Sequence, residues 1–302
     1  MAVSTTPKTW TAPEPTKPLP TLAMRKLESF DGLDGLAEAI AKRVRAALGT
    51  GTVKDLLSGT PLGHAVHPLL SDLPIGSWTS ALVLDFLGGK DSEDAADLLV
   101  AVGLAAAAPT ALSGWSDWAD STVGNKPVTR VGIVHAISNV TAVGLFAASL
   151  AARRSGARGK GKLLGLAGSG AVGLGGFLGG HLSYVQGVGV DNTAFESRPG
   201  DWVEAAFTSD LAEGRPFKAT VEGAGVLLVR EGERVFAIAE ACTHRGGPLS
   251  EGEISDGCVT CPWHGSRFRL ADGSVEQGPA TAPQPAYHVR ERDGKVEVRA
   301  HR

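Results

Sequence analysis

Long apolar runs dominate the middle of this 302-residue chain. Four of them lie near residues 69–87, 95–112, 131–152 and 163–184, and each approaches the roughly 20 residues that a helix needs to cross a bilayer. The third and fourth runs contain no Asp, Glu, Lys or Arg, so neither offers the polar face that a helix of a soluble bundle needs. The pattern predicts a four-helix membrane domain over residues 64–185, and a soluble bundle is the less favoured alternative.

The segments before these runs are less apolar. Residues 1–30 begin with a stretch rich in Pro and Thr and predict a disordered tail, because little apolar surface is available to offset the cost of ordering. Residues 31–63 predict an amphipathic helix and a linker, since the apolar positions from Leu33 to Leu48 follow helical spacing. This helix could lie on a membrane surface or pack on its own protein, and the sequence leaves both open.

The pattern changes again at about residue 201, where short alternating runs are separated by Gly and Asp. Such runs predict strands joined by tight turns. We therefore expect a small all-β domain over residues 201–302, joined to the helices by a linker over residues 186–200. The predicted fold class is multidomain, with a helical four-span membrane bundle followed by this β domain.

Composition excludes several classes of protein. The formal net charge is −3, so nothing suggests a nucleic-acid partner. Three cysteines are too few for a disulfide framework. The first residues lack the apolar stretch of a signal peptide, so insertion into lipid would depend on the internal runs. We expect a multi-pass protein of a bacterial inner membrane.

Basic residues between the third and fourth runs bear on orientation. This loop contains no acid and five basic residues: Arg153, Arg154, Arg158, Lys160 and Lys162. The positive-inside rule places it in the cytoplasm, and an even number of spans then places the β domain outside. A cytoplasmic β domain is the alternative, because the N-terminal segment would otherwise have to cross unaided. The pair Arg153-Arg154 also resembles a twin-arginine export signal, although an ordinary basic loop is the simpler interpretation.

Two short segments of the β region carry Cys and His at metal-ligand spacing. The sequence contains Cys242-Thr-His244, then sixteen residues, then Cys261-Pro-Trp-His264. Two thiolates suit one iron of a [2Fe–2S] cluster and two neutral imidazoles suit the other. The same four residue types also suit Zn²⁺, but zinc fingers usually pair Cys with Cys and His with His along the chain. The order favours an iron–sulfur cluster.

These segments carry a family resemblance. The chain contains CTHRGGPLSEG and then CPWHGSRFRLADGS, which together resemble the Rieske ferredoxin domain. The resemblance implies that Cys242 and Cys261 bind one iron, that His244 and His264 bind the solvent-facing iron, and that a Pro-rich loop at residues 278–285 covers the cluster. It also implies transfer of single electrons between a redox donor and an acceptor, either proteins or quinone.

The sequence departs from the respiratory branch of that family. The ligand segments lack the extra cysteines that form a disulfide there, and Cys258 falls outside the ligand pattern, as a buried residue on the preceding strand. Ser266 is retained, but Phe268 stands where that branch has Tyr. Fewer donors to the cluster sulfurs lower the potential, so we expect a potential below that of quinol-oxidising Rieske proteins. No oxygenase domain follows, and we predict no catalytic residue.

Four histidines lie in or beside the apolar runs: His64, His67, His135 and His181. Antiparallel spans would place all four toward the membrane face that the β domain follows. Two imidazoles from facing helices could ligate a b-type haem, and His with Asp72 could bind a quinone. Structural interface residues are the alternative. The segment GHAVHPLLSDLPIGSW also resembles an uncharacterised bacterial four-helix membrane family with an HP motif.

The sequence as a whole predicts a membrane-bound electron-transfer protein. It would carry a Rieske [2Fe–2S] cluster, with a haem or quinone site in the membrane domain as a further element. The alternative is a membrane-anchored module in which the cluster senses redox state or supports the fold without turnover.

Overall fold

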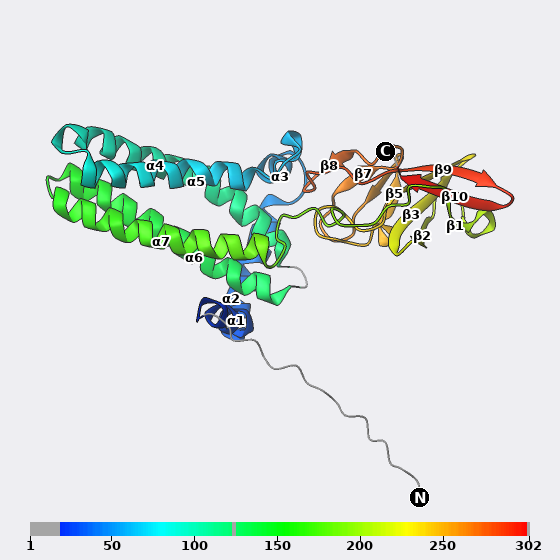
Figure 1. Cartoon of the computed structure of the whole chain (residues 1–302), viewed down its shortest axis with the longest axis horizontal. Helices are drawn as coiled ribbons and strands as arrows, with labels where there is room; N and C mark the ends of the chain where they lie inside the picture. The colour runs from blue at the N-terminus through cyan, green and yellow to red at the C-terminus, as the bar shows by residue number, and fades with distance from the viewer. Residues whose placement is uncertain (1–18, 123–124, 301–302) are drawn as a thin grey trace, which may run out of the picture.

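The computed structural model describes residues 19–122 and 125–300, and it places a long helical bundle beside a β domain (Figure 1). The helices are α1 (Leu19–Ser29), α2 (Asp34–Leu48), α3 (Thr52–Ser58), α4 (Val66–Leu87), α5 (Glu93–Ser121), α6 (Lys126–Arg154) and α7 (Arg158–Tyr184). Short 3-10 turns, η2 (Thr60–Leu62) among them, connect some of these helices. Each of the four apolar runs therefore forms one of the long helices α4 to α7.

Three helical segments of the described chain are long and apolar enough to cross a membrane: Lys90–Ser121, Lys126–Arg154 and Arg158–Tyr184. Between 17% and 33% of their most apolar stretches is buried in the protein, so most of this surface faces outward. Helix α4 is 22 residues long but contains Asp72, Pro74 and Asp85, and it is not among these three segments. The predicted count of four spans is thus not confirmed.

Close packing of small and aromatic residues holds the long helices together. The rings of Trp78 on α4 and Phe146 on α6 stack with centroids 4.2 Å apart. A Cβ atom added at Gly103 of α5 would lie 2.3 Å from Nε1 of Trp78, so only glycine admits the indole there. Glycine-mediated contacts of this kind are typical of membrane helices, which cannot rely on a hydrophobic driving force.

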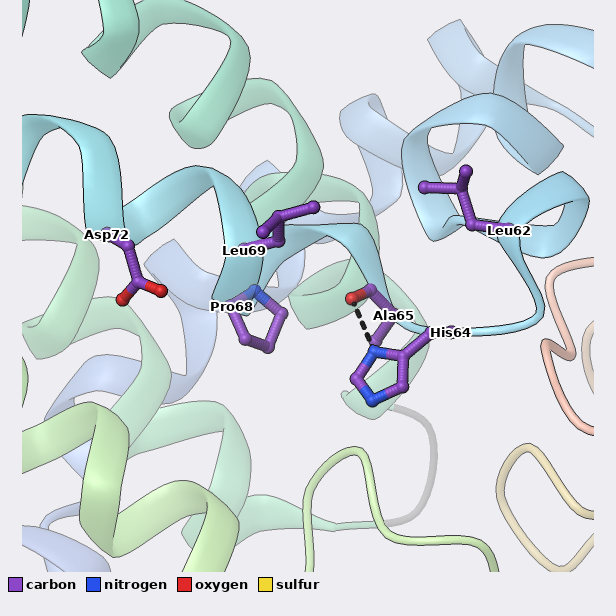
Figure 2. A pocket seen from close by; sticks show the side chains of 6 residues that line it. All are labelled: Leu62, His64, Ala65, Pro68, Leu69 and Asp72. Carbon is purple, nitrogen blue, oxygen red and sulfur yellow. Dashed lines mark hydrogen bonds between the residues drawn. The ribbon is translucent and has the colours of Figure 1, made fainter.

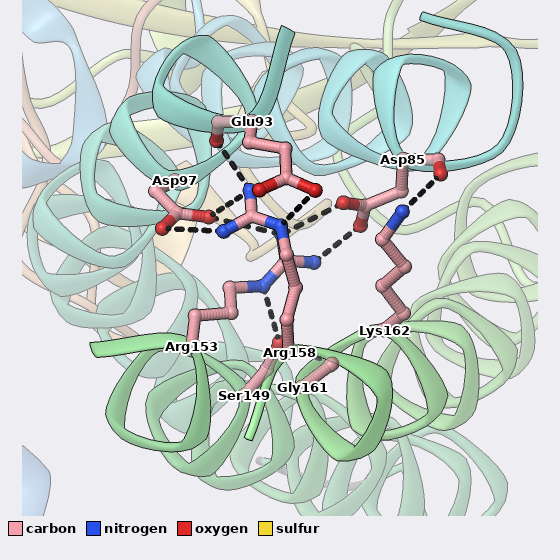
Figure 3. Close-up of polar contacts among 8 residues, drawn as sticks. All are labelled: Asp85, Glu93, Asp97, Ser149, Arg153, Arg158, Gly161 and Lys162. Carbon is pink, nitrogen blue, oxygen red and sulfur yellow. Dashed lines mark hydrogen bonds and ion pairs between the residues drawn. The ribbon is translucent and has the colours of Figure 1, made fainter. Parts of the chain in front are cut away.

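The α4–α5 and α6–α7 turns lie at the bundle end farthest from the β domain (Figure 1). A network of ion pairs and hydrogen bonds joins the helices there (Figure 3). The network joins Asp85 of α4, Glu93 and Asp97 of α5, Arg153 of α6, and Arg158 and Lys162 of α7. The side chains of Arg153 and Asp85 are each 1% exposed. Arg153 and Arg158, two of the five basic residues between the third and fourth apolar runs, are therefore paired with acids. A twin-arginine export signal must be exposed, and Arg153 is buried.

The two N-terminal helices pack on the bundle. Ala37 and Ala41 of α2 are fully buried in a cluster with Trp118 and Ile133, so this amphipathic helix packs on its own protein. Helix α1 lies within the segment expected to be disordered, and this part of the expectation is wrong. Its Met24 is buried against α6 and α7, which offsets the cost of ordering. Residues 1–18 of the expected tail lie outside the described residues.

The β domain contains β1 (Val203–Phe207), β2 (Pro216–Val221), β3 (Ala224–Glu231), β4 (Arg234–Ala239), β5 (Glu253–Ser255), β6 (Cys258–Thr260), β7 (Arg267–Arg269), β8 (Val275–Gln277), β9 (Tyr287–Arg292) and β10 (Lys295–Ala300). They form three antiparallel sheets with strand orders β1-β10-β9, β2-β3-β4 and β5-β6-β7-β8. The expected all-β domain is confirmed.

Strand β3 separates two hydrophobic cores. Val226 and Leu228 point into the core shared with β9 and β10, whereas Leu227 and Val229 point into the core beneath the ligand loops. Successive side chains of a strand face opposite sides, so a strand buried on both faces reads as the continuous apolar run that β3 has. The second core supports the two loops described next.

Candidate functional site

The two predicted ligand loops have the same backbone geometry. In the first, the N–H of Gly246 donates to Cys242 O at 2.7 Å and the N–H of Cys242 donates to Gly247 O at 2.9 Å. In the second, Gly265 donates to Cys261 O at 3.1 Å and Cys261 donates to Ser266 O at 2.8 Å. Gly246 and Gly265 have φ values of +70° and +77°, which favour glycine. Each loop thus turns tightly around its own Cys and His.

The four predicted ligands lie together at one end of the β domain. The imidazole rings of His244 and His264 have centroids 5.0 Å apart. Cys242 and Cys261 are buried and free, as is Cys258, which lies on β6 as expected. A Cβ atom added at Gly247 would lie 2.8 Å from Sγ of Cys261. The backbone therefore leaves room beside this sulfur that a larger residue would fill.

Several buried atoms of this site suit a metal cluster. Nδ1 of His244 and Nε2 of His264 are buried without a hydrogen-bond partner among the described residues. Burial lowers the pKa of both imidazoles, which favours the neutral form that binds iron. The hydrogen bond between the two ligand cysteines lowers the pKa of the Cys261 thiol to about 7 and raises the pKa of the Cys242 thiol. The donor set thus fits a [2Fe–2S] cluster. Within the described residues, no three His, Cys, Asp or Glu side chains lie close enough together to bind a single metal ion.

The Pro-rich loop at residues 278–285 contacts both ligand loops. The side chain of Gln284 is 1% exposed, and its Oε1 accepts a hydrogen bond from the N–H of Thr243 at 3.1 Å. The N–H of Ala280 donates to Oγ of Ser266 at 3.0 Å. These bonds hold the Pro-rich loop against Thr243 of the first ligand loop and Ser266 of the second. Phe268 is fully buried in the core below.

The membrane domain also reaches this end of the β domain. Nε2 of His244 lies 3.7 Å from Oδ2 of Asp120, near the C-terminal end of α5. Nζ of Lys54, on α3, lies 2.7 Å from the same oxygen. Arg245 Nη2 donates to Oγ of Ser121 at 2.5 Å. The first ligand loop therefore faces buried charges of the helical domain.

A second set of hydrogen bonds joins the helical domain to the Pro-rich loop. The N–H of Gly278 donates to Oδ1 of Asp55 on α3 at 3.0 Å. Oγ1 of Thr60 in η2 donates to Ala280 O at 3.0 Å. We call these bonds, together with the approach of Asp120 to His244 and the hydrogen bond from Arg245 to Ser121, the interdomain contact. Figure 1 shows α3 beside β8 in agreement with it.

The four membrane-domain histidines have separate hydrogen-bond partners. His67 Nδ1 lies 3.0 Å from Thr110 O, between α4 and α5. His135 lies between α6 and α7, with Nδ1 2.8 Å from Gly175 O and Nε2 3.1 Å from the amide of Asn139. His181 Nε2 lies 2.8 Å from Glu28 of α1. These contacts bind helix to helix.

His64 lines an open pocket of about 530 Å³ where η2 meets α4 (Figure 2). The other residues of the pocket are Leu62, Ala65, Pro68, Leu69 and Asp72. Figure 2 shows the His64, Pro68 and Asp72 side chains on one side of this segment. Leu62 and Leu69 are 65% and 63% exposed. The pocket thus combines a mostly apolar surface with two polar groups.

Sequence reasoning did not assign Lys54 or Asp120 to the site. The polar end of the second apolar run, Trp-Ser-Asp-Trp-Ala-Asp-Ser at residues 115–121, was the available signal. Acidic residues there are expensive inside a membrane and are functional candidates, but nothing in the sequence indicated that His244 would meet them.

Comparisons with known proteins agree with the two-part organisation. Residues 201–288 match the family described as Rieske [2Fe-2S] domain. Residues 63–192 match the family described as predicted membrane protein (DUF2231).

Individual relatives match the β domain over a limited length. Apoptosis-inducing factor 3 of Homo sapiens is 39% identical over 75 residues, which cover 24% of this chain and 12% of that protein. The ferredoxin component of the naphthalene 1,2-dioxygenase system of Pseudomonas putida is 34% identical over 67 residues, which cover 22% of this chain and 64% of that protein. The ferredoxin of carbazole 1,9a-dioxygenase from Nocardioides aromaticivorans IC177 is a similar solved structure, with 29% identity, 33% of this chain and 98% of that chain covered, and a TM-score of 0.32.

Proposed function

On the premise that residues 201–288 are a Rieske [2Fe–2S] domain and residues 63–192 a predicted membrane domain, we propose that this chain is a membrane-bound carrier of single electrons. Cys242 and Cys261 would bind one iron of the cluster, and His244 and His264 the other. The observation that carries the proposal is the pair of identical turns, each of which presents one buried Cys and one His with an unpartnered ring nitrogen.

The bound cluster would take up and release one electron at a time. The chain's own residues prepare the site. Burial favours the neutral form of both imidazoles, the small Gly247 leaves space beside the sulfur of Cys261, and the Pro-rich loop contacts both ligand loops. The relatives named as ferredoxin components support redox proteins as partners.

We include α4 as a fourth span in this proposal. Its Asp85 is paired with Arg153, which removes most of the cost of an acid at this position, and Val83, Phe86 and Leu87 are exposed apolar residues. Four spans place both ends of the chain on one side of a bacterial inner membrane. Arg154 at the end of α6 and Lys160 in the first turn of α7 remain exposed, so the positive-inside rule favours an extracytoplasmic β domain, with a cytoplasmic one as the alternative.

Quinone is a second candidate partner, and the pocket beside η2 favours it. His64 and Asp72 could hydrogen-bond the oxygens of a quinone ring, while the exposed leucines of this pocket would contact its apolar parts. Haem is not part of the proposal, because both ring nitrogens of His135 already have partners. The rival function is a redox-sensing or structural cluster without turnover, which would not be re-oxidised by an added quinone or partner protein.

The direct test is an electron paramagnetic resonance spectrum of the dithionite-reduced, detergent-purified protein. We expect a Rieske signal in the wild type, its loss in Cys242→Ala and in His244→Ala, and its retention in Cys258→Ala. Cys258 is a matched control because it is also a buried free cysteine of the β domain. A wild type without a Rieske signal, or a normal signal in His244→Ala, would contradict the ligand assignment.

A further inference from the structure

The interdomain contact brings a buried carboxylate of the membrane domain to the proposed cluster. We propose that Asp120 is a positioning residue for His244, and that the Asp120–Lys54 pair sets the reduction potential of the cluster. This inference rests on the proposed function, because it concerns a ligand of the proposed cluster. Asp120 belongs to the helical domain, whereas all four proposed ligands belong to the β domain.

Asp120 lies close to His244 in a buried environment. The side chains of Asp120 and Lys54 are 6% and 5% exposed, and that of His244 is 13% exposed. Oδ2 of Asp120 is paired with the ammonium group of Lys54 at 2.7 Å, and it lies 3.7 Å from Nε2 of His244. A small rotation of either side chain would let Nε2–H donate to this oxygen. Nδ1, on the other side of the same ring, would then be directed to the iron.

Asp120 lies at the C-terminal end of α5, where the helix dipole adds to its charge. Asp120 is the penultimate residue of α5, which ends at Ser121, so the negative end of the helix dipole also faces the imidazoles. The backbone of Asp120 additionally contacts His264. The bond from Arg245 to Ser121 holds the first ligand loop against the same turn. Both imidazoles therefore meet the end of one helix.

The ion pair with Lys54 allows an electrostatic role of Asp120 to be distinguished from a purely structural one. The ammonium group of Lys54 is bound to Asp120 and also donates to Ser116 O at 3.1 Å and to Ser116 Oγ at 2.7 Å. A negative charge near an iron ligand opposes the arrival of an electron, whereas a positive charge favours it. Removing the two partners should therefore shift the potential in opposite directions.

The experiment is a redox titration of the full-length, detergent-purified protein, monitored by the Rieske electron paramagnetic resonance signal. We expect Asp120→Asn to raise the potential and Lys54→Met to lower it. Each change should alter the reduction equilibrium about tenfold, which is about 59 mV for a one-electron couple. The double variant should lie between the two. Glu38→Gln is the matched control, because Glu38 is an exposed acid of α2, and its removal should leave the potential unchanged.

The outcomes distinguish this inference from the proposed function. A normal Rieske signal with no shift, or with shifts of the same sign in Asp120→Asn and Lys54→Met, would overturn the role of Asp120 and leave the cluster in place. A wild type without the signal would instead overturn the proposed function.

A conservative variant covers the case in which Asp120→Asn does not fold. Asp120→Glu keeps the charge and moves the carboxylate by one methylene. The inference then requires altered nitrogen hyperfine couplings of the histidine ligands in Asp120→Glu, and unchanged couplings in Glu38→Asp. Unchanged couplings in Asp120→Glu would refute the contact with His244.

Discussion

Removing Arg153 should destabilise the bundle more than any surface substitution. Its guanidinium is 1% exposed and pairs with Asp85, whose side chain is equally buried. It also lies 3.1 Å from Asp97 and 3.1 Å from Oγ of Ser149. These contacts link α6 to both α4 and α5. In Arg153→Met, the carboxylate of Asp85 would remain buried without its main partner.

The size of the expected loss of stability depends on whether one or both partners of a buried ion pair are removed. Removing one partner leaves an uncompensated charge and costs about 3–5 kcal/mol, whereas replacing both by apolar residues is often nearly neutral. We therefore expect Arg153→Met to cost about 3–5 kcal/mol of stability, and Arg153→Met with Asp85→Leu to recover most of it. The matched control is Arg154→Met, because Arg154 is the exposed neighbour and its loss should cost about 0.5 kcal/mol or less.

The assay is thermal and denaturant unfolding of these three variants and of the single variant Asp85→Leu in detergent, with helix content by circular dichroism as the readout. A double-mutant cycle on Arg153 and Asp85 gives their coupling. The Rieske signal should survive in all variants, since the turns that carry this network lie at the bundle end away from the β domain (Figure 1). Equal stability of Arg153→Met and Arg154→Met would refute the reasoning.

Two further predictions concern the site. Gly247→Ala should lower the iron content and the Rieske absorbance of the purified protein, because its Cβ would lie 2.8 Å from Sγ of Cys261; full iron content would contradict this crowding. The double variant Asp55→Ala with Thr60→Val removes the helical partners of the Pro-rich loop at residues 278–285. It should speed proteolysis in the linker at least several-fold while the visible spectrum of the β domain stays unchanged, and an unchanged cleavage rate would show that these bonds do not hold the domains together.

Much of the fold could be predicted from local pattern. The apolar runs predicted α4 to α7, because the length of an apolar stretch and the absence of a polar face depend only on neighbouring residues. The strands of the β domain followed from alternation and from Gly and Asp turns. The proposed ligand set came from two short motifs whose residues lie close in the chain. Helix α1 was missed, because its order depends on burying Met24 against α6 and α7.

The contacts between distant segments could not be predicted in the same way. Lys54, Asp120 and His244 come from α3, α5 and the first ligand loop, and no spacing relates them. The pairing of Arg153 with Asp85 likewise changed the interpretation of a loop that reads as simply basic. The partners of His67, His135 and His181 are groups of facing or neighbouring helices, which the sequence cannot pair.

The sequence by itself determined the chemistry that each segment can carry: apolar helices for a membrane domain, and a Cys-His pair in each of two loops for a Rieske cluster. These are properties of side-chain type and short-range spacing. Only the tertiary structure decided which charges are buried, which of them neutralise each other, and that a helix of the membrane domain ends against the histidines of the β domain. The physical reason is that burial and electrostatic pairing depend on distances in space, which chain folding sets and linear order does not contain.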